Sequence, residues 1–209
     1  MVLVHLIYDL TQIYNILPWG NNPLFLLIKN YGAVAFFLLS GICATLGTRE
    51  LKRGALVFGC GLLVSAVTAL FSPQTPIRFG VLHCLGLCML LWHPLKKQPT
   101  PLLAAGGAVM ALLGLGFTGL HVKNPCLYPL GLTTRDFYSA DFFPLLPFLG
   151  FFLLGAALGR RLYRQRRSLL PRADIRNPMI RFLLLCGRHS LVIYLLHQPV
   201  LMLAIEAFA

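Results

Sequence analysis

Long apolar runs dominate this chain, and short polar or basic turns separate one run from the next. We expect seven such runs, at residues 1–17, 24–46, 54–71, 79–92, 102–120, 142–158 and 186–209. A run of about 20 apolar residues is long enough to cross a bilayer as a helix. The pattern therefore predicts an all-α, polytopic membrane bundle of about seven transmembrane helices, formed by residues 1–209 as a single domain.

Composition agrees with a membrane protein. Of the 209 residues, 57% are hydrophobic and 11% are charged, and the mean hydropathy is +0.76. Soluble domains carry about 25% charged residues. The net charge of +12 does not indicate nucleic acid, because the basic residues lie between apolar runs and form no exposed basic face. The six cysteines show no CxxC pair and no zinc-type spacing, so we expect no metal site.

The basic residues also predict an orientation. Most of the 18 Lys and Arg residues follow the second, fourth and sixth runs: Arg49, Lys52, Arg53, Lys96, Lys97, Arg160, Arg161, Arg164, Arg166, Arg167, Arg172, Arg176 and Arg181. Turns on the other side hold only Lys29, Arg78, Lys123 and Arg135. Since basic turns stay in the cytoplasm, we expect a cytoplasmic N-terminus and an outward-facing loop at residues 121–141.

The first run carries an unusual group of polar side chains. His5, Tyr8, Asp9 and Gln12 are spaced by helical offsets that place all four on one face. The Asp9 carboxylate could accept a ring N–H and hold the His5 imidazole as a base. The alternative is a polar clamp between helices. We favour a functional role, because a carboxylate at membrane depth is costly.

The last run carries a second group. His197 and Gln198 lie in its middle, Tyr194 shares a helical face with His197, and Pro199 removes one backbone hydrogen bond. His5 and His197 are the same number of residues from the outer ends of their runs, about 18 Å at the helical rise. We therefore expect the two histidines at one depth. Because Asp9 is costly in hydrocarbon, we also expect His5, Asp9 and His197 to line one water-accessible cavity.

Further candidates lie near the membrane boundaries. Arg78, His83 and Asp141 are candidate acceptor-binding residues on the outer side, together with Tyr194 and Gln198. The alternative for Arg78 is snorkelling, the alternative for His83 is a bond to a backbone carbonyl, and the alternative for Asp141 is a helix start. Arg181 and Arg188 are candidate phosphate ligands on the inner side, although anionic lipid headgroups would explain them equally well. Ser40 and Gly41 are typical of close helix packing.

Several stretches together resemble the bacterial relatives of heparan-α-glucosaminide N-acetyltransferase, within the transmembrane acyltransferase superfamily. The matching stretches are HLIYDL (5–10), FFLLSGICATLGTRELKRG (36–54), IRFGVLHCLG (77–86), DFFPLLPFLGFFLLGAALG (141–159) and GRHSLVIYLLHQPV (187–200). They occur in the family's order along nearly the whole chain.

The resemblance implies acetyl-CoA or another acyl-CoA as the cytoplasmic donor, and a glycan or amino-sugar acceptor at the outer side. It also implies that His5 is catalytic, as the first-span histidine of the superfamily. The chain begins four residues before His5, without the family's usual Asp-x-x-Arg-Gly segment. We therefore expect a shortened member, or a start that lies upstream. The expected location is a bacterial inner membrane, with lipid as a partner and a homodimer as one possible assembly.

The leading hypothesis is a membrane-bound acyltransferase. His5 would act as the base and Asp9 would orient it, while His197 would donate to the thioester oxygen or act as a second base. The sequence shows no Ser-His-Asp nucleophile elbow, so direct transfer is the simpler route, and an acyl-histidine intermediate stays open. A small proton-coupled transporter and a non-catalytic membrane protein are the alternatives.

Overall fold

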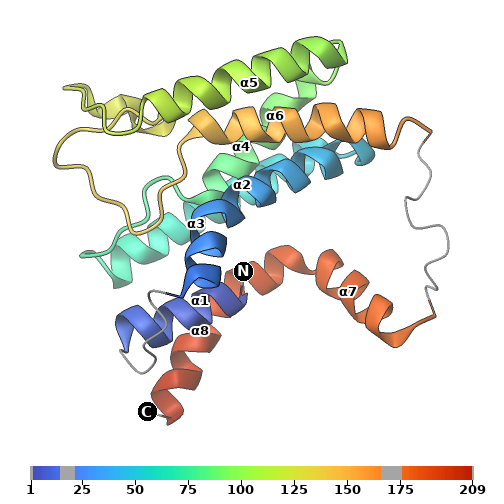
Figure 1. Cartoon of the computed structure of the whole chain (residues 1–209). Helices are drawn as coiled ribbons and strands as arrows, with labels where there is room; N and C mark the ends of the chain where they lie inside the picture. The colour runs from blue at the N-terminus through green and yellow to red at the C-terminus, as the bar shows by residue number, and fades with distance from the viewer. Residues whose placement is uncertain (1, 15–21, 166–175, 209) are drawn as a thin grey trace. The chain divides into compact units, whose positions relative to one another are not determined.

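The structure, a computed structural model, describes residues 2–14, 22–165 and 176–208 (Figure 1). Its helices are α1 (Val2–Tyr8), the π-helix η1 (Asp9–Ile13), α2 (Pro23–Leu46), α3 (Glu50–Phe71), α4 (Val81–Leu95), α5 (Thr100–Gly116), the 3-10 helix η2 (Pro125–Leu130), α6 (Leu145–Leu162), α7 (Pro178–Arg188) and α8 (Ser190–Phe208). In the described ranges, β-type pairing is limited to two isolated bridges, Phe79 with Phe142 and His121 with Thr133. The predicted all-α class is confirmed.

The chain forms two compact units. The first comprises Met1–Ala33 and Leu170–Ala209, and in it α1 and α7 both contact α8. The second comprises Val34–Leu169 and contains α3 to α6 with most of α2. In this second unit α6 packs on both α5 and α4, and α3 packs on α4.

Close backbone approach joins α2 to α6 inside the second unit. A Cβ atom added at Gly41 would overlap the main chain of Phe152, and one added at Gly155 would overlap the main chain of Leu38. The Phe37 and Phe152 side chains are fully buried in the same region. The prediction of close helix packing at Ser40–Gly41 is therefore confirmed.

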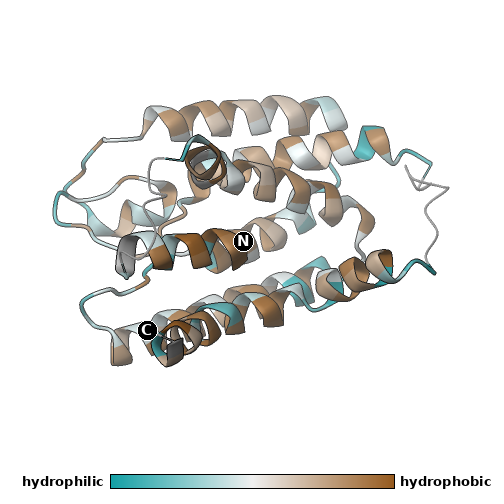
Figure 2. Cartoon of the chain, turned by 60° about the horizontal axis from the view of Figure 1, so that its bottom comes forward, coloured by the Kyte–Doolittle hydropathy of each residue, from teal (hydrophilic) through white to brown (hydrophobic). Residues whose placement is uncertain are grey.

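Apolar residues predominate along most of the helices (Figure 2), and many of their large apolar side chains are exposed. Helices α3, α6 and α8 are long and apolar enough to cross a membrane, and the described residues also form shorter apolar helices of 10–17 residues. In the most apolar 18-residue stretch of α3, and in that of α8, only 11% of the residues are buried, against 50% in α6. Because water disfavours such surfaces, α3 and α8 require an apolar surrounding such as lipid.

The last apolar run is not one helix, so the prediction of a continuous span over 186–209 was wrong. Helix α7 ends at Arg188, His189 adopts a non-helical conformation (φ −103°, ψ 16°), and α8 begins at Ser190. Glycine disfavours a helix interior, and Gly187 lies just before this break. The membrane-spanning candidate is therefore α8 alone, and α7 is a separate short helix.

Candidate functional site

Two histidines meet between α1 and α8. The ring centroids of His5 and His197 lie 4.8 Å apart, and their planes meet edge to face at 71°. These residues are almost a full chain length apart in sequence, and the sequence placed them at one depth only through helical rise. The prediction that the two histidines lie together is confirmed.

Hydrogen bonding fixes the tautomer of neutral His197. Its Nδ1 atom lies within hydrogen-bond distance of the Tyr194 carbonyl oxygen. A carbonyl can only accept, so Nδ1 carries the proton and donates it. The Nε2 atom then carries a lone pair, and this atom is buried without a hydrogen-bond partner among the described residues. His197 therefore presents an unused acceptor in its neutral form.

Asp9 is fully buried and is held from across the helix pair. The amide Nε2 of Gln198 lies 3.0 Å from both Asp9 oxygens, and it donates to this carboxylate. Asp9 is also the first residue of η1, where the backbone widens from α-helix to π-helix. Such π-helical turns are frequent at functional sites. The buried Thr11 hydroxyl donates to the Ile7 carbonyl in the same turn.

The expected hydrogen bond between His5 and Asp9 is not formed within the described residues, and the Asp9 carboxylate accepts from Gln198 instead. Of the first run's polar group, the side chain of Gln12 lies outside the description. Sequence reasoning had selected Gln198 for substrate contact and missed its pairing with Asp9. Only a partner for the buried carboxylate could have been anticipated.

The Gln198 side chain carries a second unused acceptor. Gln198 Oε1 is buried without a hydrogen-bond partner among the described residues, as is His197 Nε2. Reversing the amide of Gln198 would face its oxygen to the Asp9 carboxylate, so Asp9 fixes its orientation. Buried acceptors without a donor are rare in proteins and require an explanation. A ligand with O–H or N–H groups would satisfy both atoms.

The remaining candidates of the first unit surround this pair less closely. The Tyr194 ring lies 5.4 Å from the His197 ring. Arg181 and Arg188 are both exposed on α7, seven residues apart and hence on one helical face. Met179, Phe182 and Leu183 are also exposed on this helix.

In the second unit, His83 is buried and bonded through both ring nitrogens. The Gly80 N–H donates to His83 Nδ1 at 3.3 Å, and His83 Nε2 lies 3.3 Å from Ser65 Oγ. The Ser65 hydroxyl donates to the Ile77 carbonyl, so its oxygen accepts the His83 Nε2–H. His83 thereby ties the start of α4 to α3. Sequence reasoning missed Ser65, because a lone serine in an apolar span gives no specific signal.

The Asp141 side chain caps the start of α4, and not the start of α6, the helix that follows it in the chain. Its Oδ2 accepts the Val81 N–H at 3.0 Å, at the first turn of α4. Burial raises the pKa of the Asp141 carboxyl, and this hydrogen bond partly opposes the rise. Nearby, the Arg78 guanidinium lies 5.6 Å from the centre of the Phe137 ring, and the Arg78 N–H donates to Ser139. The 121–141 loop therefore packs against the segment before α4.

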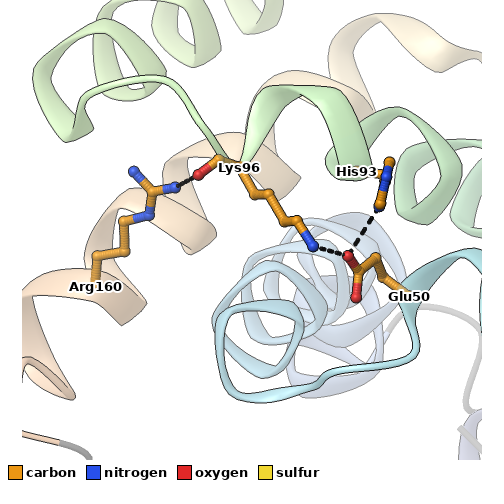
Figure 3. A network of polar contacts seen from close by, with 4 residues as sticks. All are labelled: Glu50, His93, Lys96 and Arg160. Carbon is orange, nitrogen blue, oxygen red and sulfur yellow. Dashed lines mark hydrogen bonds and ion pairs between the residues drawn. The ribbon is translucent and has the colours of Figure 1, made fainter.

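A third polar cluster joins α3, α4 and α6 (Figure 3). The buried Glu50 carboxylate accepts from Lys96 and lies 3.0 Å from His93 Nδ1. The Arg160 guanidinium donates to the carbonyls of Gln98 and Lys96 and lies 5.3 Å from the Trp92 ring. Sequence reasoning treated Lys96 and Arg160 only as basic-turn residues, because charge counting gives no pairing.

Comparison with protein families gives one match. The model of the family "Heparan-alpha-glucosaminide N-acetyltransferase, catalytic" matches residues 1–199. The chain belongs to this family. No curated protein and no solved structure matches it.

Family membership indicates an acyltransferase-type function, and the apolar helices indicate a membrane protein. The family uses acetyl-CoA as its donor. Among the described residues, no group of three or more His, Cys, Asp and Glu side chains is placed to hold a metal ion.

Proposed function

We propose that this protein transfers an acetyl or other acyl group from acyl-CoA to a hydroxyl or amino group of a sugar, at the site around His5 and His197. One observation carries the proposal: His197 Nε2 and Gln198 Oε1 are buried acceptors without a hydrogen-bond partner among the described residues, and the His197 ring contacts the His5 ring. A sugar hydroxyl or amine supplies the donors that these two atoms lack. Family membership supports the acyltransferase chemistry.

The chemistry needs one proton transfer on each side of the acyl carbon. The acceptor O–H or N–H donates to an imidazole nitrogen while its heavy atom attacks the thioester carbon. The new C–O or C–N bond forms, the C–S bond breaks, and the departing thiolate takes a proton from an imidazolium. We assign the catalytic proton transfer to His5, and His197 serves as the second base through its free Nε2. In this proposal the buried Asp9 carboxylate stabilises the imidazolium, because opposite charges attract.

Gln198 links these roles. Its N–H bonds hold Asp9 in place, and its Oε1 faces away as an acceptor for the substrate. Tyr194 contributes through its carbonyl, which sets the His197 tautomer. An acyl-histidine intermediate is compatible with the same geometry, because the lone pair on His197 Nε2 is a nucleophile as well as a base.

For the membrane arrangement we propose seven spans with the N-terminus in the cytoplasm, in a bacterial inner membrane. The seven apolar runs of the sequence support this number, and the alternation of basic turns supports the orientation. Acyl-CoA then arrives from the cytoplasm and the acceptor from outside. A homodimer stays part of the proposal, and metal is not required by the steps above.

On the acceptor side we propose that Arg78 contacts the sugar, while His83 and Asp141 hold the segment that carries it. On the donor side we propose Arg181 and Arg188 as phosphate contacts, since both are exposed on one face of α7.

A sided assay tests the function. Purified protein is placed in sealed vesicles, with radiolabelled acetyl-CoA inside and glucosamine outside. We expect acetylated glucosamine outside and free coenzyme A thiol inside, in equal amounts. A transporter would instead move acetyl-CoA, glucosamine or protons without releasing thiol. Absence of both thiol and acetylated product, across amino and hydroxyl sugar acceptors, would contradict the proposal.

A further inference from the structure

A basic cavity of about 580 Å³ lies at the turn between α2 and α3. Its lining residues are Cys43, Leu46, Gly47, Thr48, Arg49 and Arg53. The Arg53 guanidinium reaches back over Gly47, because its Nη1 lies 3.6 Å from the position of a Cβ there. Two arginines, a hydroxyl and a thiol thus share one hollow in the second unit.

Neither arginine has a protein partner among the described residues. Glu50 is the acid that adjoins Arg49 in sequence, and its carboxylate is bound by Lys96 and His93 instead (Figure 3). Helical spacing puts Arg49 and Arg53 one turn apart. The Glu50 pairing therefore leaves two adjacent guanidinium groups free to bind an anion at the cavity.

We infer that this cavity is a binding site for a phosphate-bearing group. A phosphate oxygen pair matches the fork of a guanidinium, and the Thr48 hydroxyl supplies a further donor. Both arginines belong to a basic turn that the charge pattern assigns to the cytoplasmic side. The occupant that we assign is the phosphates of the acyl donor, and this assignment rests on the proposed function. A phospholipid headgroup offers the same chemistry.

The native thiol of Cys43 reports on occupancy. Cys43 and Cys126 are both exposed, and only Cys43 lines the cavity. Protein in neutral detergent is treated with a maleimide, and the adducts at both cysteines are measured by mass spectrometry. We expect acetyl-CoA to protect Cys43 and leave Cys126 unprotected, and acetyl-dephospho-CoA or inorganic pyrophosphate to protect Cys43 at higher concentration.

Matched variants test the arginines. Each hydrogen bond to a charged group contributes about 1.5–3 kcal/mol, so Arg49→Gln and Arg53→Gln should each raise the half-protecting concentration by about tenfold or more. Lys52→Gln removes the same charge from the same turn at a residue outside the cavity, and should change it by less than about twofold. Equal effects of Lys52→Gln and Arg53→Gln would overturn the inference.

The source of the phosphate is separated by a second arm. Suppose that phosphatidylglycerol vesicles protect Cys43 from the maleimide more than phosphatidylcholine vesicles do, while acetyl-CoA gives no protection. The occupant is then a headgroup, and the phosphate site stands. Protection by none of the four probes, acetyl-CoA, its dephospho form, pyrophosphate and phosphatidylglycerol, would overturn it. If the arginine variants transfer acetyl groups with unchanged acetyl-CoA dependence, the donor assignment fails and the proposed function stands. If pyrophosphate protects Cys43 but no acetyl transfer occurs, the site stands and the proposed function fails.

Discussion

The Gln198 amide faces the Asp9 carboxylate, with Nε2 at 3.0 Å from each of its two oxygens. This contact joins the first and last apolar segments of the chain inside a helix pair that also brings His5 to His197. A buried carboxylate needs such a donor, because losing its partner leaves a desolvated charge. The same side chain carries the buried Oε1 acceptor, so Gln198 belongs both to the helix contact and to the proposed site.

Replacing either member of this pair should destabilise the protein. For Gln198→Leu we expect a loss of about 1–3 kcal/mol of unfolding free energy, since the Asp9 carboxylate stays buried without its donor. Adding Asp9→Leu to Gln198→Leu should destabilise the protein by less than the sum of the two single replacements, because the unpaired carboxylate is then removed as well. A double-mutant cycle measured by thermal unfolding in detergent should give a coupling of about 0.5–3 kcal/mol. Strict additivity would show that the contact contributes nothing.

Native cysteines should report the orientation. Cys126 lies on the 121–141 loop and Cys43 in the last turn of α2, and both are exposed. We expect a membrane-impermeant maleimide to label Cys126 in intact cells, and Cys43 only after permeabilisation, because the basic turns are cytoplasmic. The reverse pattern would invert the proposed topology.

Asp141 should make stability depend on pH in the acid range. Burial raises the pKa of its carboxyl in the folded protein, so folding favours the protonated form. Stability should therefore fall as pH rises from the ordinary pKa of 3.8 to the raised value. Asp141→Asn keeps an oxygen for the Val81 N–H and removes the charge, so it should flatten this part of the profile.

The control for this prediction is Asp136→Asn. Asp136 is exposed on the same loop, and its replacement should leave the fall in stability unchanged. Melting temperatures recorded across this pH range would check both variants. A wild-type profile that rises with pH through this range would mean that the hydrogen bond from Val81 outweighs burial.

Hydrophobic patterning predicted most of the helices, because a long apolar run forms a helix when lipid or neighbouring helices bury its apolar face. It failed at residues 186–209, where the break at His189 depends on local backbone preference inside an apolar run. The constant helical rise predicted that His5 and His197 lie at one depth, but whether their helices touch could not be read from the sequence. Pairings such as Asp9 with Gln198, Asp141 with Val81, or Glu50 with Lys96 depend on which helices are neighbours. A pattern along one chain does not carry that information.

The central claim is that His5 transfers the proton in acyl transfer, and thiol release from acetyl-CoA in the presence of glucosamine tests it most directly. The comparison is between the wild type, His5→Ala and a matched control, His189→Ala, whose side chain is exposed between α7 and α8. We predict that His5→Ala lowers the rate by about 10²–10⁴-fold, as expected for losing a general base, while its expression and melting temperature match the wild type. His189→Ala should retain the wild-type rate. Thiol release by His5→Ala at the wild-type rate would contradict the account, and would leave His5 as a polar contact between helices.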